Sequence, residues 1–331
     1  MILITGASGF IGSHLAEELT KRKEKVRVLV RNLNEIGYIH DFSKEIRNKI
    51  EIVEGDLLDK TSLIKALKGT NKVFHLAAIS RPMNIPKQKY FDVNLYGTRN
   101  LLEACKKQKI KKIIHVSSMS VFGFSRDRNS LTENSSKLPV SYYGESKKQG
   151  EELAIDFCKK NKIKLIVVRP PMVFGPRDSQ FLRLFKLIDT GFFPLLKKGQ
   201  AKLEFCYVKN LVNGILLADK YGKNLESYNI SDGETYTIKE VFGKIAEAEN
   251  KKLFPISIPV WSVKASGLII EKVFLIFKKK APFNSGTAEW MSKDNVIDIS
   301  KAKKKLKYKR LIPLEEGIKE TVEWYKARRL L

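Results

Sequence analysis

The chain has 331 residues, of which 43% are hydrophobic, and its formal net charge at pH 7 is +26. This length suffices for one or two globular domains, and the hydrophobic fraction excludes a largely disordered chain. The excess of 62 Lys and Arg over 36 Asp and Glu would suit an anionic partner or substrate. The lysine clusters at 106–112, 159–164 and 301–310 lack a platform of interleaved aromatic residues, so we expect a solvated surface and no nucleic acid.

The three cysteines, Cys105, Cys158 and Cys206, lie far apart in the sequence and form no C-x-x-C pair. Their odd number and their spacing indicate free thiols in a reducing compartment and no structural zinc. The four histidines have no metal-ligand spacing either, so we expect no metal. Because the first predicted strand leaves no room for a signal peptide, we expect a cytoplasmic protein.

The first residues predict a strand, a glycine-rich turn and a helix. Residues 2–5 are apolar or β-branched, and Gly6, Gly9 and Gly12 follow in a G-x-x-G-x-x-G arrangement before a helical pattern over 10–19. Glycine allows a tight turn and a close approach of an anion, which the N–H groups of a helix N-terminus attract. The stretch therefore predicts a phosphate cradle, although glycine-rich turns also occur without a ligand.

Residues 26–30 predict a second strand that ends at Arg31, about 20 residues beyond the glycine turn. NAD-binding units commonly carry Asp or Glu at this place, where it bonds the ribose 2′-hydroxyl. Arginine would instead pair with a 2′-phosphate, so we favour NADP(H) and keep NAD(H) as the alternative. Glu35 lies nearby and complicates the choice, and Arg31 would also fit an exposed strand end.

Further strands are predicted over 50–53, 73–76 and 113–117, and a helix over about 90–107. Strands that alternate with helices at this spacing predict a parallel, doubly wound α/β sheet, the Rossmann fold. Ligands of such sheets bind beyond the carboxyl ends of the strands. These ends carry Gly6, Arg31, Asp56, Ala77 and Ser117.

Tyr143 and Lys147 are four residues apart in a predicted helix that runs to about residue 161, so they share a helix face. A neighbouring ammonium is expected to lower the pKa of a phenol toward the working range. A serine at the end of the adjacent strand would bond the same carbonyl or alcohol oxygen. The pattern predicts a proton relay for hydride transfer, although Tyr-x-x-x-Lys is also common in ordinary helices.

The order of these motifs resembles the extended short-chain dehydrogenase/reductase family, that is, the NAD-dependent epimerase/dehydratase superfamily, over essentially the full length. The matching stretches are TGASGFIGSHL (5–15), GDL (55–57), HLAA (75–78), VNLYGTRNLLEA (93–104), VSSMSVFG (116–123), YYGESK (142–147) and RPPMVFGP (169–176).

The resemblance implies that Ser118, Tyr143 and Lys147 are the catalytic residues and that Lys147 also holds the nicotinamide ribose. Tyr142 is not expected to be catalytic, because the residue four positions further on is Ser146. Asp56 would bond the adenine. The full set of expected cofactor-binding residues is Gly6, Ser8, Gly9, Phe10, Ile11, Gly12, Arg31, Asp56, Leu57, Leu76, Ala77, Ala78, Asn94, Tyr143, Lys147, Pro170 and Val173.

Residues 169–218 look more like the 3β-hydroxysteroid and sterol dehydrogenase branch than like the sugar-nucleotide branch. Sugar-nucleotide epimerases usually place an arginine just before the corresponding strand to grip a diphosphate. This chain has Leu203, Glu204 and Phe205 there, and a carboxylate would repel phosphate. Lys198, Lys202 or Arg183 could substitute for the missing arginine.

Residues 256–280 are rich in bulky apolar side chains but are interrupted by charges, so they are too polar to span a bilayer. They fit a buried helix of the smaller lobe, a lid over a lipophilic substrate, or an interfacial helix on anionic lipid. We favour the lid, with peripheral membrane contact through 256–280 as an addition to it.

We therefore expect a Rossmann domain over 1–170, to which segments near 203–230 return, and a smaller, mixed α/β substrate-binding lobe over 171–331. The expected reaction is hydride transfer between NAD(P) and a secondary alcohol or ketone of a lipophilic, sterol-like or other apolar small molecule. The alternatives are a nucleotide-sugar 4-epimerase or dehydratase with tightly bound NAD and, more remotely, a nucleotide-sensing binding module. The resemblance also implies a homodimer.

Overall fold

The computed structural model describes residues 1–80, 85–125, 130–252, 254–258 and 292–331. Its largest element is a seven-stranded parallel sheet with the strand order β10-β6-β5-β4-β1-β2-β3. The strands in chain order are β1 (Ile2–Thr5), β2 (Val26–Val30), β3 (Ile50–Glu54), β4 (Lys72–His75), β5 (Lys112–Val116), β6 (Lys164–Arg169) and β10 (Glu226–Asn229).

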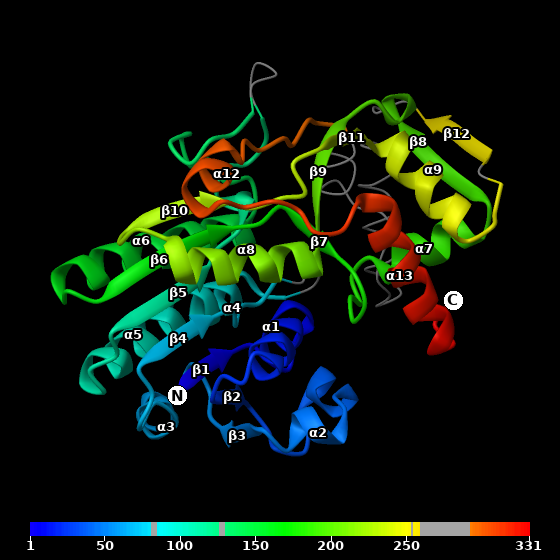
Figure 1. Cartoon of the computed structure of the whole chain (residues 1–331). Coiled ribbons are helices and arrows are strands. Elements are labelled where there is room, and N and C mark those ends of the chain that lie inside the picture. The colour runs from blue at the N-terminus through cyan, green and yellow to red at the C-terminus, as the bar shows by residue number, and fades with distance from the viewer. Residues whose placement is uncertain (81–84, 126–129, 253, 259–291) are drawn as a thin grey trace.

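Helices cover both faces of this sheet (Figure 1). One face packs on α1 (Phe10–Lys21), α8 (Val208–Tyr221) and α12 (Ser300–Leu306). The other face packs on α3 (Lys60–Ala66), α5 (Thr98–Lys107) and α6 (Tyr142–Lys160). Because both faces are buried, the inner strands are mostly apolar, as ILIT in β1 shows, whereas the edge strands β3 (IEIVE) and β10 (ESYN) also carry polar residues. The doubly wound parallel sheet predicted from the sequence is confirmed.

The chain order in the sheet reverses between β1 and β4. From β1 the chain builds outward through β2 to β3, and it then crosses back to place β4 on the other side of β1. Such a switch point leaves a crevice at the carboxyl ends of the strands, where ligands of open α/β sheets bind. The glycine turn after β1 lies at this switch point.

A smaller set of elements forms a second hydrophobic core. It contains a three-stranded sheet of β7 (Met172–Phe174), β9 (Lys202–Tyr207) and β11 (Thr235–Thr237), and a parallel pair of β8 (Phe192–Leu196) and β12 (Phe254–Ile258). Helices α7 (Leu182–Asp189), α9 (Ile238–Ala248) and α13 (Leu314–Ala327) contribute to the same core. This confirms a smaller, mixed lobe, whereas the boundary expected at residue 170 stays a prediction.

The helix predicted over 90–107 is divided in the structure. It consists of α4 (Lys87–Phe91), a π-helical segment η2 (Asp92–Gly97) and α5. Helix α6 packs closely here, because a Cβ at Gly150 would lie 2.3 Å from the carbonyl oxygen of Asn94. Tertiary packing therefore widens a turn that local apolar periodicity predicts as regular helix.

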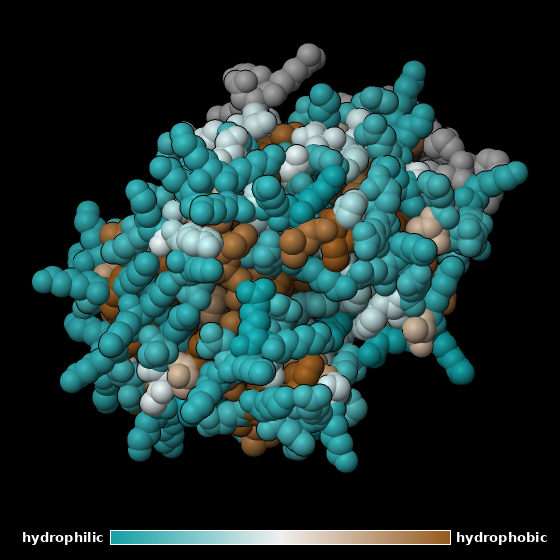
Figure 2. Space-filling view, viewed as in Figure 1, coloured by the Kyte–Doolittle hydropathy of each residue, from teal (hydrophilic) through white to brown (hydrophobic). Residues whose placement is uncertain are grey.

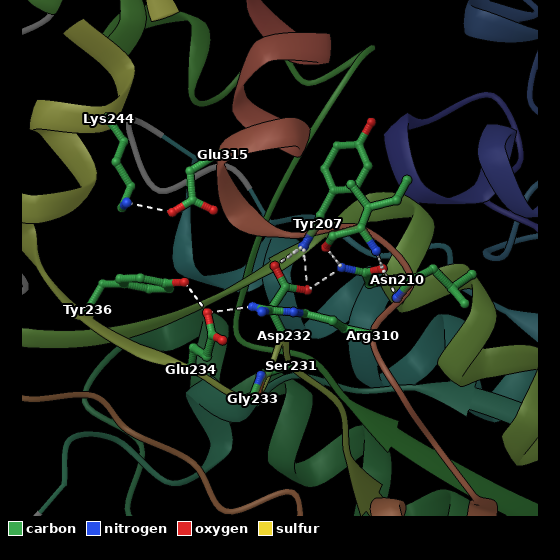
Figure 3. A network of polar contacts seen from close by, with 12 residues as sticks. Tyr207, Asn210, Ser231, Asp232, Gly233, Glu234, Tyr236, Lys244, Arg310 and Glu315 are labelled. Atoms are coloured by element: carbon green, nitrogen blue, oxygen red, sulfur yellow. Dashed lines mark hydrogen bonds and ion pairs between the residues drawn. The ribbon is translucent and has the colours of Figure 1, made fainter. Parts of the chain in front are cut away.

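A buried polar network ties the C-terminal segment 308–312 to the start of α8 (Figure 3). Asp232 accepts hydrogen bonds from the backbone N–H of Tyr207 and from Asn210. Asn210 also donates to the carbonyl of Ile312 and accepts from the N–H groups of Leu311 and Ile312. This network joins elements that are about a hundred residues apart in sequence.

No helix among the described residues is long and apolar enough to cross a bilayer. Of the segment 256–280, only 256–258 are described, as the end of β12, and the expectations for the rest lie outside the described residues. Figure 2 shows that hydrophilic side chains cover most of one face of the molecule, with hydrophobic residues exposed between them. This agrees with the solvated lysine-rich surface expected from the composition.

Candidate active site

The glycine turn between β1 and α1 has the geometry of an anion cradle. Gly6 has φ +74°, and a Cβ at this position would lie 2.7 Å from the backbone nitrogen of Ala77. A Cβ at Gly12 would lie 2.2 Å from the carbonyl oxygen of Gly6. Glycine is therefore required at both positions, because the turn, α1 and the end of β4 approach one another at backbone distance.

The start of α1 leaves backbone donors free for a phosphate. Gly9 is the N-cap residue, and Phe10 and Ile11 begin the helix. N–H groups in the first turn of a helix have no acceptor within the helix, and they lie at the positive end of its dipole. Ser8 is fixed beside them, since its carbonyl oxygen accepts a hydrogen bond from Tyr38 at 3.1 Å. These residues fit a nucleotide pyrophosphate.

One side wall of the crevice is the short segment that follows β4. Thr5 Oγ1 accepts a hydrogen bond from the N–H of Ala77 at 3.2 Å and lies 2.8 Å from His75 Nδ1. Leu76, Ala77 and Ala78 are half-buried. The small side chains of the two alanines leave room for a flat ring beside the backbone.

The expected adenosine side is formed by the ends of β2 and β3. Gly55 N–H donates to the carbonyl of Val30 at 2.8 Å, so Arg31 and Asp56 leave neighbouring strand ends. Arg31 is exposed, and Asp56 is half-buried with one oxygen occupied by the N–H of Leu58 at 2.8 Å. Leu57 is buried. Arg31 and Asp56 therefore come from adjacent strand ends on the side of the sheet where the adenosine is expected.

Ser118 and Tyr143 are brought together across the carboxyl end of β5. Ser118 follows β5, and Tyr143 lies in the first turn of α6, which Ser141 caps by accepting a hydrogen bond from the N–H of Gly144. The Ser118 side chain lies within hydrogen-bonding reach of the Tyr143 phenol, and its hydroxyl also donates to Ser120 Oγ at 3.1 Å. Two groups that could bond one substrate oxygen thus lie side by side.

Burial raises the pKa of the Tyr143 phenol, and the neighbouring Ser118 hydroxyl opposes this effect. The direction is opposite to the lowering by Lys147 that the sequence suggested. Two features explain the difference: desolvation penalises the phenolate, and the Lys147 ammonium donates to the carbonyl of Val116 at 2.9 Å. The expected lowering is therefore corrected for the protein as this structure describes it.

Lys147 is buried beside the sheet, with an exposed fraction of 4%. Burial lowers the pKa of its ammonium to about 8, and the carboxylate of Glu151 opposes this effect. Its single protein acceptor in the described residues is the carbonyl of Val116. An ammonium has three N–H donors, so two remain for a ligand in the crevice.

Asn94 uses its side chain to hold the backbone. Its Oδ1 accepts the N–H of Ile79 at 2.8 Å, and its Nδ2 donates to the Ile79 carbonyl at 3.1 Å and to Ser146 Oγ at 2.9 Å. With three contacts inside the protein, Asn94 fastens the segment after β4 to α6. These contacts support a role for Asn94 in holding the backbone geometry.

Pro170 follows β6 directly, and Val173 lies in β7. The carbonyl of Pro170 accepts a hydrogen bond from the N–H of Met119, so Pro170 borders the loop that carries Ser118. Val173 is half-buried and packs against both the large core and the core of the smaller lobe. Both residues thus lie between the main sheet and the smaller lobe.

Glu151 and Arg169 join helix α6 to strand β6, and the sequence analysis did not identify this contact. The Arg169 guanidinium donates to both carboxylate oxygens of Glu151, at 2.6 and 3.0 Å, and Lys137 lies 2.7 Å from the same carboxylate. The Arg169 and Lys137 charges hold the pKa of Glu151 at about 2 against the effect of burial. The sequence did contain one indication of a role for Glu151, because Glu151 lies four residues after Lys147 and therefore on the same face of the predicted helix.

The stretch around Leu203 to Phe205, near which sugar-nucleotide epimerases usually carry a diphosphate-binding arginine, is mostly apolar in this chain. Leu203 is fully buried in the core of the smaller lobe, with Phe205 in the same cluster. Glu204 points elsewhere, because its carboxylate is hydrogen-bonded to Ser231 and Thr235. The carboxylate is thus a structural group of β9. In the described part of the chain, no cluster of His, Cys, Asp and Glu could hold a metal ion.

Comparisons of the sequence with known proteins identify the family to which such a site belongs. Residues 2–231 match the model of the NAD dependent epimerase/dehydratase family. The chain is 26% identical to sterol-4-alpha-carboxylate 3-dehydrogenase, decarboxylating, of Mus musculus, over 97% of this chain and 89% of that protein. It is 31% identical to N-acetyl-alpha-D-glucosaminyl-diphospho-ditrans,octacis-undecaprenol 4-epimerase of Escherichia coli O157:H7, over 78% of this chain and 75% of that protein.

Among solved structures, the chain is similar to UDP-glucuronic acid 4-epimerase from Bacillus cereus in complex with NAD. The TM-score is 0.80 at 27% sequence identity, and the alignment covers 99% of both chains. The relatives thus include enzymes named for sterol substrates, for a lipid-linked sugar and for nucleotide sugars.

Proposed function

Because this chain belongs to the NAD-dependent epimerase/dehydratase family, we propose that it is a dehydrogenase or reductase that acts on a secondary alcohol or ketone of a lipophilic substrate. The observation that carries the proposal is the close approach of the Ser118 hydroxyl and the Tyr143 phenol at the carboxyl end of β5, beside the buried Lys147. A binding module that only senses a nucleotide has no need of these three groups.

In this proposal the chain's own residues manage the substrate oxygen. Tyr143 gives a proton to the oxygen of a ketone, or takes one from the hydroxyl of an alcohol, and Ser118 orients the same oxygen. Lys147 donates to the carbonyl of Val116 and has two further N–H donors, which would hold the nicotinamide ribose when the cofactor is bound. The nicotinamide cofactor supplies the hydride-accepting or hydride-donating carbon when it is bound.

The lipophilic substrate is supported by the interior of the smaller lobe. Where sugar-nucleotide epimerases usually place a diphosphate-binding arginine, this chain has Leu203 and Phe205, which belong to the apolar core of the smaller lobe. In a sugar-nucleotide enzyme, Lys198, Lys202 or Arg183 would have to take the place of that arginine. The sterol dehydrogenase among the relatives agrees with this choice.

We further propose that NADP(H) is preferred over NAD(H). Arg31 is exposed at the end of β2, where an acidic residue would bond a ribose hydroxyl, and it is free to pair with a 2′-phosphate. The residues proposed to bind the pyrophosphate are those of the turn between β1 and α1.

We also keep the homodimer, formed through helices beside the central strands, as part of the proposal.

A nucleotide-sugar or lipid-linked-sugar 4-epimerase is the second candidate. It is favoured by the NAD-bound 4-epimerase structure that aligns over 99% of both chains, and by the undecaprenol-linked 4-epimerase at 31% identity. The same Ser118, Tyr143 and Lys147 would serve it, since an epimerase first oxidises an alcohol and then reduces the ketone.

The test is to identify any nucleotide that leaves the purified protein on denaturation, and then to titrate the protein with NADPH and NADH. A nucleotide-free protein that binds NADPH more tightly than NADH supports the dehydrogenase or reductase. Stoichiometric NAD⁺ that survives purification favours the epimerase, whose hydride returns to the same substrate. A protein that binds neither nucleotide contradicts both.

A further inference from the structure

Three exposed apolar side chains lie on the segment that leads into α6, the helix that carries Tyr143. Leu138, Val140 and Tyr142 lie within five residues, and their exposed fractions are 43%, 56% and 57%. Exposed apolar residues are ordinary when they are scattered singly, whereas a cluster at one edge indicates a contact surface. We call these three residues the apolar rim.

The apolar rim stands on a firm base beside the catalytic groups. A Cβ at Gly123 would lie 2.4 Å from the carbonyl of Leu138, so this stretch packs directly on the loop that follows Ser118. Tyr142 immediately precedes Tyr143 in α6. Successive residues of a helix point about 100° apart, so Tyr142 faces solvent while Tyr143 contacts Ser118.

Lysines lie close to two aromatic rings, one in the apolar rim and one next to the residue on which the rim packs. The Lys87 ammonium lies 5.1 Å from the ring centre of Tyr142, and the Lys293 ammonium lies 4.7 Å from that of Phe124. Phe124 follows Gly123, the residue against which the rim packs. Aromatic side chains with nearby lysines are typical of protein surfaces at the headgroup level of a membrane.

We infer that the apolar rim docks on an anionic lipid bilayer and brings the mouth of the catalytic crevice to the membrane surface. The net charge of +26 supplies long-range attraction to such a surface, and Leu138, Val140 and Tyr142 enter the interface. The inference rests on the proposed lipophilic substrate, which would pass from the bilayer to Tyr143 without crossing water. It assigns the contact to 138–142, a site distinct from the segment 256–280.

The experiment is co-sedimentation of the full chain with vesicles of phosphatidylcholine alone, or of phosphatidylcholine with about 30% phosphatidylglycerol. The test variant is Leu138→Ser/Val140→Ser. The matched control is Leu311→Ser, which changes a leucine that is 64% exposed on the C-terminal segment. A charge pair completes the set, with Lys87→Glu at the rim and Lys305→Glu on α12.

We expect the wild type and Leu311→Ser to bind the anionic vesicles, and the rim double variant to lose at least about tenfold in partition coefficient. Lys87→Glu should weaken binding more than Lys305→Glu does. Absence of wild-type binding to anionic vesicles overturns the inference, and so does equal binding by the wild type and the double variant. Equal losses of vesicle binding in the double variant and in Leu311→Ser would also overturn the inference.

A failure of the docking inference can be distinguished from a failure of the proposed function. Sedimentation requires no turnover, and Tyr143→Phe should bind the vesicles as the wild type does. NADPH titration of the double variant without vesicles should match the wild type, because Leu138 and Val140 are not among the residues proposed to bind the nucleotide. Normal titration with no vesicle binding thus overturns the docking inference alone.

Discussion

Tyr143 carries the proposed chemistry through a single oxygen atom. Its pKa is raised by burial, so the phenol is protonated at neutral pH and can donate to a ketone. We expect Tyr143→Phe to lower turnover by about a hundredfold or more while nucleotide affinity stays nearly unchanged. Steady-state kinetics and NADPH titration measure the two effects. The neighbouring Tyr142→Phe is the matched control, and equal activity of the two variants would contradict the assignment.

Arg31 decides the nucleotide preference in the proposal. Because Arg31 is exposed at the end of β2, replacement by an acidic residue should not disturb the core. We expect Arg31→Asp to weaken NADPH binding relative to NADH by about tenfold to a hundredfold, since a carboxylate repels a 2′-phosphate and accepts a bond from a ribose hydroxyl. Calorimetric titration with both nucleotides measures the ratio. An unchanged ratio would remove Arg31 from the cofactor site.

The turn between β1 and α1 depends on a contact that a single carbon atom would break. A Cβ at residue 12 would lie 2.2 Å from the carbonyl of Gly6. We expect Gly12→Ala to destabilise the fold by about 1–3 kcal/mol and to abolish tight nucleotide binding, because α1 must move away from the turn. Chemical denaturation and nucleotide titration measure the two effects.

Gly243 in α9 provides the control for this prediction. An added Cβ there would meet no atom within 4 Å, so Gly243→Ala should raise helix propensity and stabilise the protein by about 0.5–1 kcal/mol. Nucleotide binding should not change. Similar effects of the two substitutions would show that the close approach at Gly12 is not decisive.

Elements with local signals were predictable from the sequence. β1 and β2 have the predicted bounds, β3 is one residue longer, and β4 and β5 each begin and end one residue earlier than predicted. Short apolar runs between turns define such strands of a parallel sheet. The spacing of Tyr143 and Lys147 likewise fixed their shared helix face. Elements that depend on distant contacts were not predictable, as the π-helical segment 92–97 shows, which fits against Gly150.

The same distinction applies to the candidate site. The glycine turn is visible as a local motif, whereas the bond between Arg169 and Glu151 joins a strand to a helix and has no local signature. The direction of the Tyr143 pKa shift depends on burial, which spacing does not reveal. Local motifs therefore predicted the helix and the strand end that carry Tyr143 and Ser118, but not the contacts that hold these elements in place.

At the scale of the whole molecule, Asn210 connects the start of α8 with the C-terminal segment. Its side chain makes four hydrogen bonds, with Asp232, with the N–H groups of Leu311 and Ile312, and with the Ile312 carbonyl. We expect Asn210→Ala to lower the free energy of unfolding by about 2–4 kcal/mol, because it leaves these buried groups unpaired. Denaturant titration measures the loss.

The control for this prediction lies on the same helix. Asn213 makes one hydrogen bond to the exposed carbonyl of Lys309, at 3.3 Å. Asn213→Ala should therefore cost only about 0.5 kcal/mol. Equal losses at the two positions would show that the buried network does not carry the connection.

Glu249 gives the smaller lobe a pH dependence of known sign. Its carboxylate is buried with no hydrogen-bond partner among the described residues, and burial together with Asp189 raises its pKa to about 8. In the unfolded chain the Glu249 carboxyl ionises near pH 4.5. The stability that the protonated carboxyl contributes to the folded protein is therefore fully present below pH 4.5, and it is lost as the pH rises through about 8.

We expect Glu249→Gln to match the wild type near pH 4.5 and to become more stable than it above pH 8, by about 1–3 kcal/mol. Thermal unfolding of both proteins across this range measures the difference. A constant difference at all pH values would mean that the ionisation of Glu249 does not limit stability.

The strand order of the main sheet has a consequence for synthesis on the ribosome. β6 ends at Arg169, but β10, which covers its outer edge, spans Glu226–Asn229. At about 5–20 residues per second, roughly 3–12 seconds pass between the emergence of these two strands. During this interval the edge of β6 is open to pairing with another chain, and the nascent sheet must remain shielded until residues of the smaller lobe have been translated past it.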